Sequence, residues 1–336
     1  MDVAMAMLLI SASVLIIGIY LNTTDGSYDT ERMDRTAETL AGSTIAVQYD
    51  LSAVENSDEF TEPEGVTEND FRRVDYGSAL GLVADATVTN VHIHDTQTLA
   101  YADDFEAAVD ANVRSNLVGA NDRVYIQTKW EPYEGATAIG GEMTVGSPPP
   151  PHEDVSSATL SASSSVPDVT EADIRGLSTN NGVNHTVQRI SEQIALAIVE
   201  GYFPPEATQH SLESQGMYRS LKVYHYQRMG EQVDVEFDAD DGELSRTGAD
   251  APRANNLLVS NSTGRFNPDG DLSAANVSGL VDVIAYDIYH EAFADEIAEF
   301  EASEPHEGTR AKLIRDHVAE SVATGDVTIT IQTWER

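Results

Sequence analysis

The chain has no cysteine among its 336 residues, so disulfide bonds, thiolate metal sites and a cysteine nucleophile are excluded. Lysine is almost as scarce, since only Lys129, Lys222 and Lys312 occur. With 57 Asp and Glu against 19 Lys and Arg, the formal net charge is -38. Phosphate binding requires a basic surface, which this composition does not provide, so we do not expect nucleic acid as a partner.

The acidic residues are spread along the chain, and 41% of all residues are hydrophobic. This combination predicts folded domains with an acidic surface rather than a disordered acidic tail. Repulsion between surface carboxylates is screened to within ~3 Å at 1 M salt. We therefore expect a protein of a halophile, adapted to concentrated salt.

Long apolar runs are also rare, and a single one occupies residues 3–21 without any charge. As a helix rising ~1.5 Å per residue it would cover roughly 28 Å, about the thickness of the hydrocarbon core of a bilayer. A cleaved secretory signal is disfavoured, because the run has no basic start and ends in Tyr20, Leu21 and Asn22 rather than in small residues.

A plain membrane anchor remains one interpretation of this run. Its small residues favour a second one, in which the helix packs closely against other helices. The residues expected to make packing or membrane contacts are Val3, Ala4, Met7, Leu8, Ala12, Val14, Leu15, Gly18 and Ile19.

The segment MDVAMAMLLISASVLIIGIY, followed by ERMDRTAETLAGSTIAVQYDL, resembles the start of haloarchaeal type IV pilin-like proteins. The resemblance covers the apolar helix and the first segments of the head, and it includes no catalytic motif. It implies other pilin-like subunits, a membrane assembly platform and the lipid bilayer as partners. The basic leader of that family is not in this sequence, so we expect a processed precursor or an unprocessed relative. The large head favours a minor subunit.

Four Asn-x-Ser/Thr sequons favour exposure at the cell surface and predict N-glycosylation. They begin at Asn22, Asn184, Asn261 and Asn276.

The predicted fold class is α+β, with an N-terminal hydrophobic helix followed by a head of two related helix–strand units. Residues 1–30 would form the helix and stalk, 31–145 a first α+β domain, and 171–336 a second. Between them, residues 146–170 indicate a linker, because four consecutive prolines and a serine run cannot form a core.

Hydrophobic periodicity and turn residues predict the individual elements. Helices are expected over residues 31–43, 77–87, 101–118, 184–203, 277–301 and 309–323. Strands are expected over residues 45–49, 88–94, 124–130 and 326–334, with a hairpin over 219–237 and a long loop over 238–271.

The two halves also share a sequence pattern. The segment VDANVRSNLVGANDRVYIQTKWEP aligns with IRDHVAESVATGDVTITIQTWER, and each contains one of the two tryptophans, Trp130 and Trp334. Both copies read as a helix, a glycine turn and a strand, so we predict a repeated unit with helices on one face of a small sheet.

Candidate chemistry is sparse. His92 and His94 would share one face of a strand, as two metal ligands require, although two polar outward positions explain them better. Residues 238–242 and 267–271 resemble calcium-loop fragments but lack the later Glu of an EF-hand. His290 and Asp295 do not share a helix face with suitable spacing. We expect no catalytic residue, no metal and no cofactor.

Three functions remain open. The first is a structural or assembly subunit of an archaeal type IV pilus-like or related secretion filament. The second is a membrane-anchored extracellular binding module, and the third is an anchored hydrolase that uses carboxylates or the His92 and His94 pair. The first fits the apolar run best, and we expect no enzyme.

Overall fold

The computed structural model describes residues 36–117, 123–238, 242–260 and 279–334. The apolar run 3–21, with all of its predicted packing residues, lies outside these ranges. Within the described ranges, no helix has the length and hydropathy needed to cross a bilayer. The chain mixes helices with antiparallel sheets, which confirms the α+β class.

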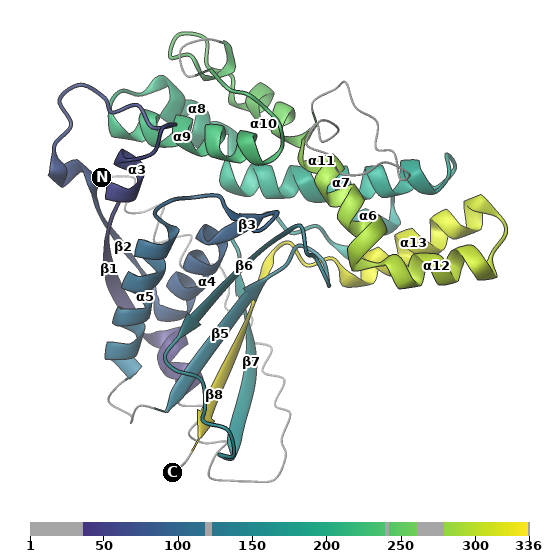
Figure 1. Cartoon of the computed structure of the whole chain (residues 1–336), viewed down its shortest axis with the longest axis horizontal. Helices are drawn as coiled ribbons and strands as arrows, with labels where there is room; N and C mark the ends of the chain where they lie inside the picture. Colours follow the sequence, from purple (N-terminus) through teal and green to yellow (C-terminus); the bar gives the residue numbers. More distant parts are fainter. Residues whose placement is uncertain (1–35, 118–122, 239–241, 261–278, 335–336) are drawn as a thin grey trace.

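The main sheet has six strands in the order β4-β3-β6-β5-β8-β7, and every neighbouring pair is antiparallel (Figure 1). The strands are β3 (Val91–Ile93), β4 (Thr96–Gln97), β5 (Val124–Trp130), β6 (Ile139–Val145), β7 (Val155–Ser163) and β8 (Asp326–Trp334). Along β5, Ile126, Thr128 and Trp130 are buried, whereas Gln127 and Lys129 are exposed. The sheet therefore has one covered face and one face toward solvent, here called the open face.

Helices α4 (Ala79–Thr89) and α5 (Ala102–Leu117) lie on the covered face, and a second sheet packs on these helices. This second sheet is the hairpin of β1 (Thr44–Asp50) and β2 (Arg72–Ser78), in which β1 contacts α5 and β2 contacts α4. Because α4 has neighbours on both sides, apolar residues surround it instead of forming one stripe. Its first turn is fixed by the Ser78 hydroxyl, which accepts a 3.0 Å hydrogen bond from the Gly81 amide.

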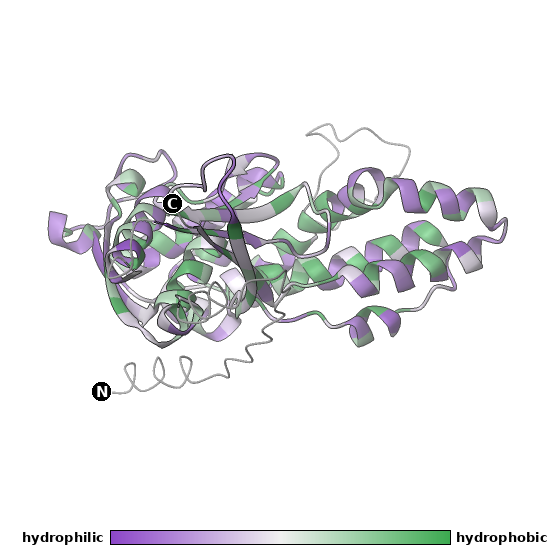
Figure 2. Cartoon of the chain, turned by 90° about the horizontal axis from the view of Figure 1, so that it is seen from below, coloured by the Kyte–Doolittle hydropathy of each residue, from purple (hydrophilic) through white to green (hydrophobic). Residues whose placement is uncertain are grey.

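The second half of the chain is mostly helical and extends away from the sheet as a helical arm (Figures 1 and 2). Its central helix α7 buries Val187, Ile190, Ile194 and Ile198 at helical spacing and contacts α10, α11 and α13. The helices of this half are α6 (Glu171–Arg175), α7 (Val183–Tyr202), α8 (Pro205–Glu213), α9 (Met217–Gln232), α10 (Ala251–Val259), α11 (Leu280–Asp287), α12 (Ala294–Ser303) and α13 (Glu307–Ser321). Shorter elements are α3 (Ser52–Glu55), η1 (Glu68–Phe71), η2 (Gly242–Leu244) and the π-helical turn η3 (Ile288–Ala292).

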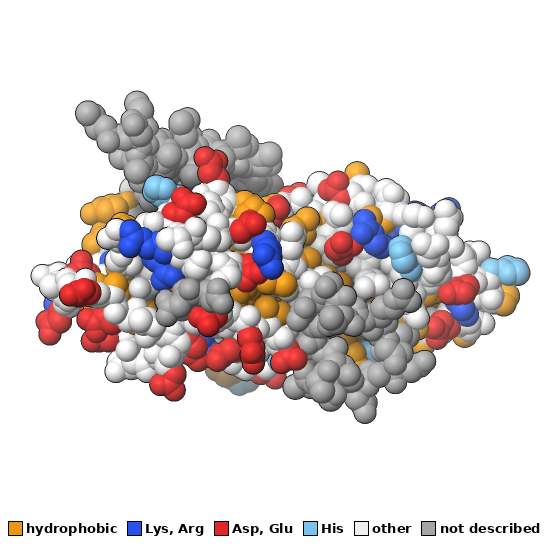
Figure 3. Space-filling view, turned by 90° about the horizontal axis from the view of Figure 1, so that it is seen from above, with side chains coloured by type: hydrophobic (Ala, Val, Ile, Leu, Met, Phe, Trp, Pro, Cys, Tyr) orange, Lys and Arg blue, Asp and Glu red, His pale blue; other side chains and the backbone are white. Residues whose placement is uncertain are grey.

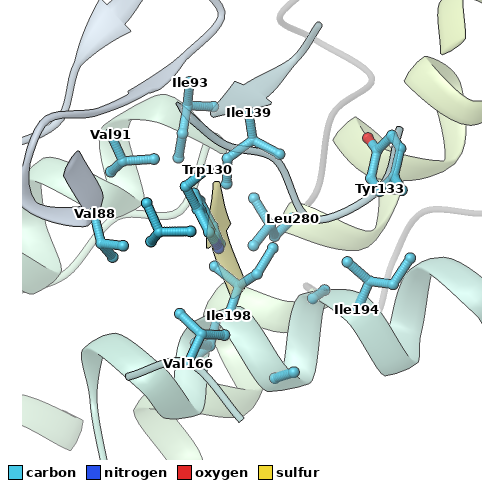
Figure 4. Close-up of a cluster of buried hydrophobic side chains, with 14 of the residues drawn as sticks. Val88, Val91, Ile93, Trp130, Tyr133, Ile139, Val166, Ile194, Ile198 and Leu280 are labelled. Atoms are coloured by element: carbon cyan, nitrogen blue, oxygen red, sulfur yellow. The ribbon is translucent and has the colours of Figure 1, made fainter. Parts of the chain in front are cut away.

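The main hydrophobic core is continuous between the sheet and the arm. Figure 4 shows Trp130 and Ile139 of the sheet beside Ile194 and Ile198 of α7 and Leu280 of α11. Residues from both predicted domains thus share one core.

The predicted linker over 146–170 is wrong for its central part, which is strand β7. All nine residues of β7 pair with β8. Ala158 and Leu160 point into the core, and Ser or Thr alternates with them outward. An edge strand needs only this short apolar stripe, so a Ser-rich segment can form one.

The helix–turn–strand pattern is present in both halves, as α5–β5 and α13–β8. However, the two strands are neighbours in one sheet, where Ile126 pairs with Ile331, the isoleucines of the two I-Q-T sequences. Helix α13 packs on α6 and α7 rather than on a sheet of its own. The prediction of two small sheets is therefore wrong.

The predicted hairpin over 219–237 is also wrong, because residues Met217–Gln232 form helix α9. Two opposite sides of α9 are buried, with Tyr224 in a small cluster beside Phe60 and Tyr226 stacked on Phe203 in the main core. This removes the amphipathic signal. The glycine expected to turn the hairpin, Gly230, lies in the last part of the helix, where a Cβ would come within 2.3 Å of the Val235 carbonyl oxygen.

Part of the predicted loop over 238–271 is likewise helical, since α10 begins where Asp250 caps the Arg253 amide. The helix predicted over 277–301 is interrupted by η3. The structure confirms, to within two residues at each end, the strands expected over 45–49, 124–130 and 326–334 and the helices expected over 101–118, 184–203 and 309–323.

Candidate functional site

A polar hollow of about 290 Å³ lies on the open face, where β3, β5 and β6 meet the loop between β5 and β6. We call it the sheet hollow. Gly140 contributes to the opening because it has no side chain, and a Cβ there would lie 3.2 Å from the Trp130 carbonyl oxygen. The lining residues are His92, Asp95, Lys129, Trp130, Glu131, Ala136, Thr137, Gly140, Gly141 and Glu142.

The His92 ring is oriented by a hydrogen bond to the backbone two residues earlier. Its Nδ1 lies 3.1 Å from the Asn90 carbonyl oxygen. A carbonyl can only accept, so Nδ1 donates and Nε2 of the neutral ring is left as an acceptor. Strand β3 ends at Ile93, and His94 and Asp95 form a two-residue turn with φ of 49° and 62°.

This turn separates the two histidines singled out in the sequence. His94 is a turn residue and does not share a strand face with His92, so the expectation that the two imidazoles lie on one face is wrong. Across the described residues, no three His, Asp or Glu side chains are grouped closely enough to hold a metal ion. His290 and Asp295 lie in η3 and α12 of the arm, and residues 239–241 and 267–271 are outside the described ranges.

The Asn90 side chain links strands β4 and β6 to helix α5 through hydrogen bonds. Its side-chain amide donates to the Glu106 carboxylate at 2.7 Å and to the Glu142 carbonyl at 3.2 Å, and its oxygen accepts from Gln97 at 2.8 Å. Partial burial raises the pKa of the Glu106 carboxyl, although the hydrogen bonds that it accepts lower the pKa. The network fixes β3, β4 and β6 relative to one another.

The hollow contains one cation among several carboxylates. Lys129 Nζ lies 2.7 Å from Glu131 Oε1, and the two side chains are 48% and 23% exposed. Asp95 and Glu142 are exposed at the rim. On the face shown in Figure 3, acidic side chains are widely spread, with Lys and Arg side chains among them. In the lining of the hollow, Lys129 is the one cation beside three carboxylates, so it is the charged donor of the site.

The loop between β5 and β6 is anchored to the arm through a buried carboxylate. Asp287, at the end of α11, accepts hydrogen bonds from the Tyr133 hydroxyl at 2.7 Å and the Thr137 amide at 3.1 Å, and from the Thr137 hydroxyl. Burial is the main cause that raises the pKa of the Tyr133 hydroxyl well above its usual value, and the negative charge of Asp287 is the second. Thr137 is thus positioned at the rim by a helix far away in sequence.

The chemistry available in the hollow is hydrogen bonding and ion pairing. An imidazole acceptor, an ammonium donor and carboxylates could orient a small polar ligand. Among the polar lining residues, His92 alone is a candidate ligand by sequence. The alternation from Gln127 to Glu131 places Lys129 and Glu131 on one face, so the pattern could have shown this pair, whereas Asn90 and Asp287 carry no local signal.

Of the four predicted glycosylation sites, one is described. Asn184 is exposed in the first turn of α7, but Thr186 of the same sequon is fully buried and its hydroxyl donates to the Gly182 carbonyl at 2.8 Å. Asn22, Asn261 and Asn276 lie outside the described residues.

Comparison with known proteins gives one match. A family model described as a family of unknown function, DUF7284, matches residues 1–334. No curated protein and no solved structure matches the chain.

Proposed function

The chain belongs to the family DUF7284, and we propose that it is an assembly subunit at the cell surface. In this proposal residues 3–21 form a helix that packs against the same helix of other pilin-like subunits, in a filament or in the membrane. The acidic head faces outward and contacts a membrane assembly platform during assembly. The observation that carries the proposal is the uncharged apolar run at the start of a chain of net charge -38.

In this proposal the head acts through contacts with other proteins, and its architecture supports that role. Its main core is continuous between an antiparallel sheet and a helical arm. We further propose that α5–β5 and α13–β8 arose from one duplicated helix–strand unit, which the pairing of Ile126 with Ile331 supports.

Substitutions within the run test this proposal against a plain anchor. Replacing Ala12 or Gly18 by Leu adds bulk where helices would approach closely, and keeps the run apolar. We expect both variants to insert into the membrane but to lose their association with other subunits in co-purification. Replacing Ala6 by Leu is the matched control, because it adds similar bulk at a residue outside the predicted packing set. If the A12L and G18L chains associate as well as the A6L chain, the packing helix is refuted and a plain anchor remains.

The sheet hollow favours a second candidate, an anchored extracellular binding module. Its test is the melting temperature of the protein with amino acids, polyamines and sugars as probes. A ligand of the hollow should raise the melting temperature of the wild type and of K312Q, which changes an exposed lysine on α13, but not of K129Q. Equal shifts in all three proteins, or none, would argue against this candidate.

A further inference from the structure

Strand β7 is the outer strand of the main sheet, and one of its edges has no strand beside it among the described residues (Figure 1). On its other edge β7 pairs with β8 without interruption, from Val155 opposite Trp334 to Ser163 opposite Asp326. Beyond β8, its main neighbour is α4 on the covered face. The free edge therefore presents a row of backbone amides and carbonyls along nine residues.

Strand β7 has none of the sequence features that usually prevent an edge strand from pairing with another chain. Natural edge strands are usually short, bulged, or marked by Lys, Pro or inward-pointing charges. The sequence VSSATLSAS has none of these residues, and its register with β8 contains no bulge. All nine positions are uncharged, in a chain that has 57 acidic residues in 336.

We infer that β7 is a contact surface between two copies of this chain, whose β7 strands pair antiparallel about a twofold axis at Thr159. This inference rests on the proposed assembly function and names a contact of the head within it. The occupant is a second copy, because its identical uncharged edge places no carboxylate in the contact, molar salt screens the repulsion between the two acidic heads, and a twofold pairing closes on itself.

The register centred on Thr159 is compatible with both faces of the sheet. It pairs Thr159 with Thr159 of the partner subunit, Ser157 with Ser161 of the partner subunit, and Ala158 with Leu160 of the partner subunit. Exposed positions then meet exposed positions, and buried positions meet buried ones. The pairing brings no two charges opposite each other and joins two six-stranded sheets into one.

The absence of cysteine makes a direct test possible. Facing Cα atoms in an antiparallel pair are ~4.5–5.5 Å apart, which is within the range of disulfide bonds. We expect the full-length T159C chain, in native membranes or detergent at molar KCl, to form a disulfide-linked dimer under mild oxidation. Paired thiols have an effective concentration near the millimolar range, so they should cross-link roughly a hundredfold faster than thiols that meet by collision at ~10 µM.

The matched control is T144C, because Thr144 is exposed on the open face of β6, away from the free edge. A mixture of S157C and S161C chains tests the register, and it should cross-link faster than either chain alone. If T159C cross-links no faster than T144C, the β7 contact is refuted. If subunits still associate through residues 3–21 in that case, the proposed function is unaffected. Faster linkage of S157C alone than of the mixture would overturn the twofold register.

Discussion

The Tyr133 hydroxyl donates a 2.7 Å hydrogen bond to Oδ2 of Asp287, and both residues are buried to at least 99%. This bond joins the loop at the end of β5 to the last turn of α11, across 154 positions of sequence. Together with the two hydrogen bonds from Thr137 to the same carboxylate, it links the sheet to the helical arm beside the sheet hollow.

Replacing Tyr133 by Phe removes this donor and leaves a buried carboxylate with one partner fewer. Hydrogen bonds to charged groups contribute about 1.5–3 kcal/mol, so we expect a loss of that size in the free energy of unfolding. Denaturant titration at fixed salt measures it. Replacing Tyr218, which is 74% exposed, by Phe is the control and should change little. A Y133F protein as stable as Y218F would show that the bond adds nothing.

Lys222 lies against the end of α7, where its Nζ donates to the Tyr202 carbonyl at 3.3 Å and sits 5.2 Å from the centre of the Phe203 ring. Burial lowers the pKa of Lys222 to about 8, below the value near 10.4 of an unfolded lysine. Between these two values the unfolded chain binds a proton that the folded chain does not. The contribution of Lys222 to stability therefore rises from pH 8 to about pH 10.

The K222M chain should lose this part of the pH dependence, and the K312M chain, changed at an exposed lysine, should keep it. Unfolding at pH 8 and pH 10 measures the difference. The same slope in wild type and K222M would contradict the assignment.

His225 gives a second window, at acid pH. Its ring lies 3.4 Å from the Tyr101 hydroxyl, and burial, with the nearby Lys222, lowers its pKa to about 3. Since an unfolded histidine titrates near pH 6.5, the stability linked to His225 is complete above that value and falls as the pH drops toward 3. We expect H225F to lose less stability than wild type between pH 6.5 and 4.5. H306F, changed at an exposed histidine, should behave like wild type. A wild-type curve for H225F would refute this account.

The net charge of -38 predicts strong dependence on salt. The Debye length falls from ~10 Å at 0.1 M to ~3 Å at 1 M, so carboxylate repulsion should decline sharply over that range. The melting temperature should rise between 0.1 M and 2 M KCl, and replacing scattered exposed Asp and Glu by Asn and Gln should flatten the rise. Equal melting temperatures at the two salt concentrations would contradict adaptation to concentrated salt.

Hydrophobic periodicity predicted the helices and strands correctly where only one side of the element is buried. Helix α7 shows its stripe from Val187 to Ile198, and strand β5 shows its alternation around Thr128. Periodicity failed to predict elements that are buried on more than one side. Helix α9 buries Tyr224 and Tyr226 in different clusters, so no helical stripe is visible in its sequence.

Pairing between strands that are far apart in the chain could not be predicted from the sequence either. The composition of β7 is typical of a linker, because only Ala158, Leu160 and, in part, Ala162 pack on the core, and its partner strand β8 is far away in the sequence. The sheet hollow depends on the same kind of contact, since Thr137 is placed by Asp287. Periodicity within a segment carries no information about such partners.

The central claim is that residues 1–30 assemble the chain with other subunits. The most direct measurement is the fraction of protein that co-purifies from detergent with a differently tagged full chain, for the full chain and for a chain that lacks residues 1–30. Buried Ala37 and Leu40 lie beyond the deletion, so the head should keep its fold. The account predicts that the full chain co-purifies and that the shortened chain does not. A full chain that fails to co-purify, as a plain anchor would, or a shortened chain that co-purifies to the same extent, would contradict the account.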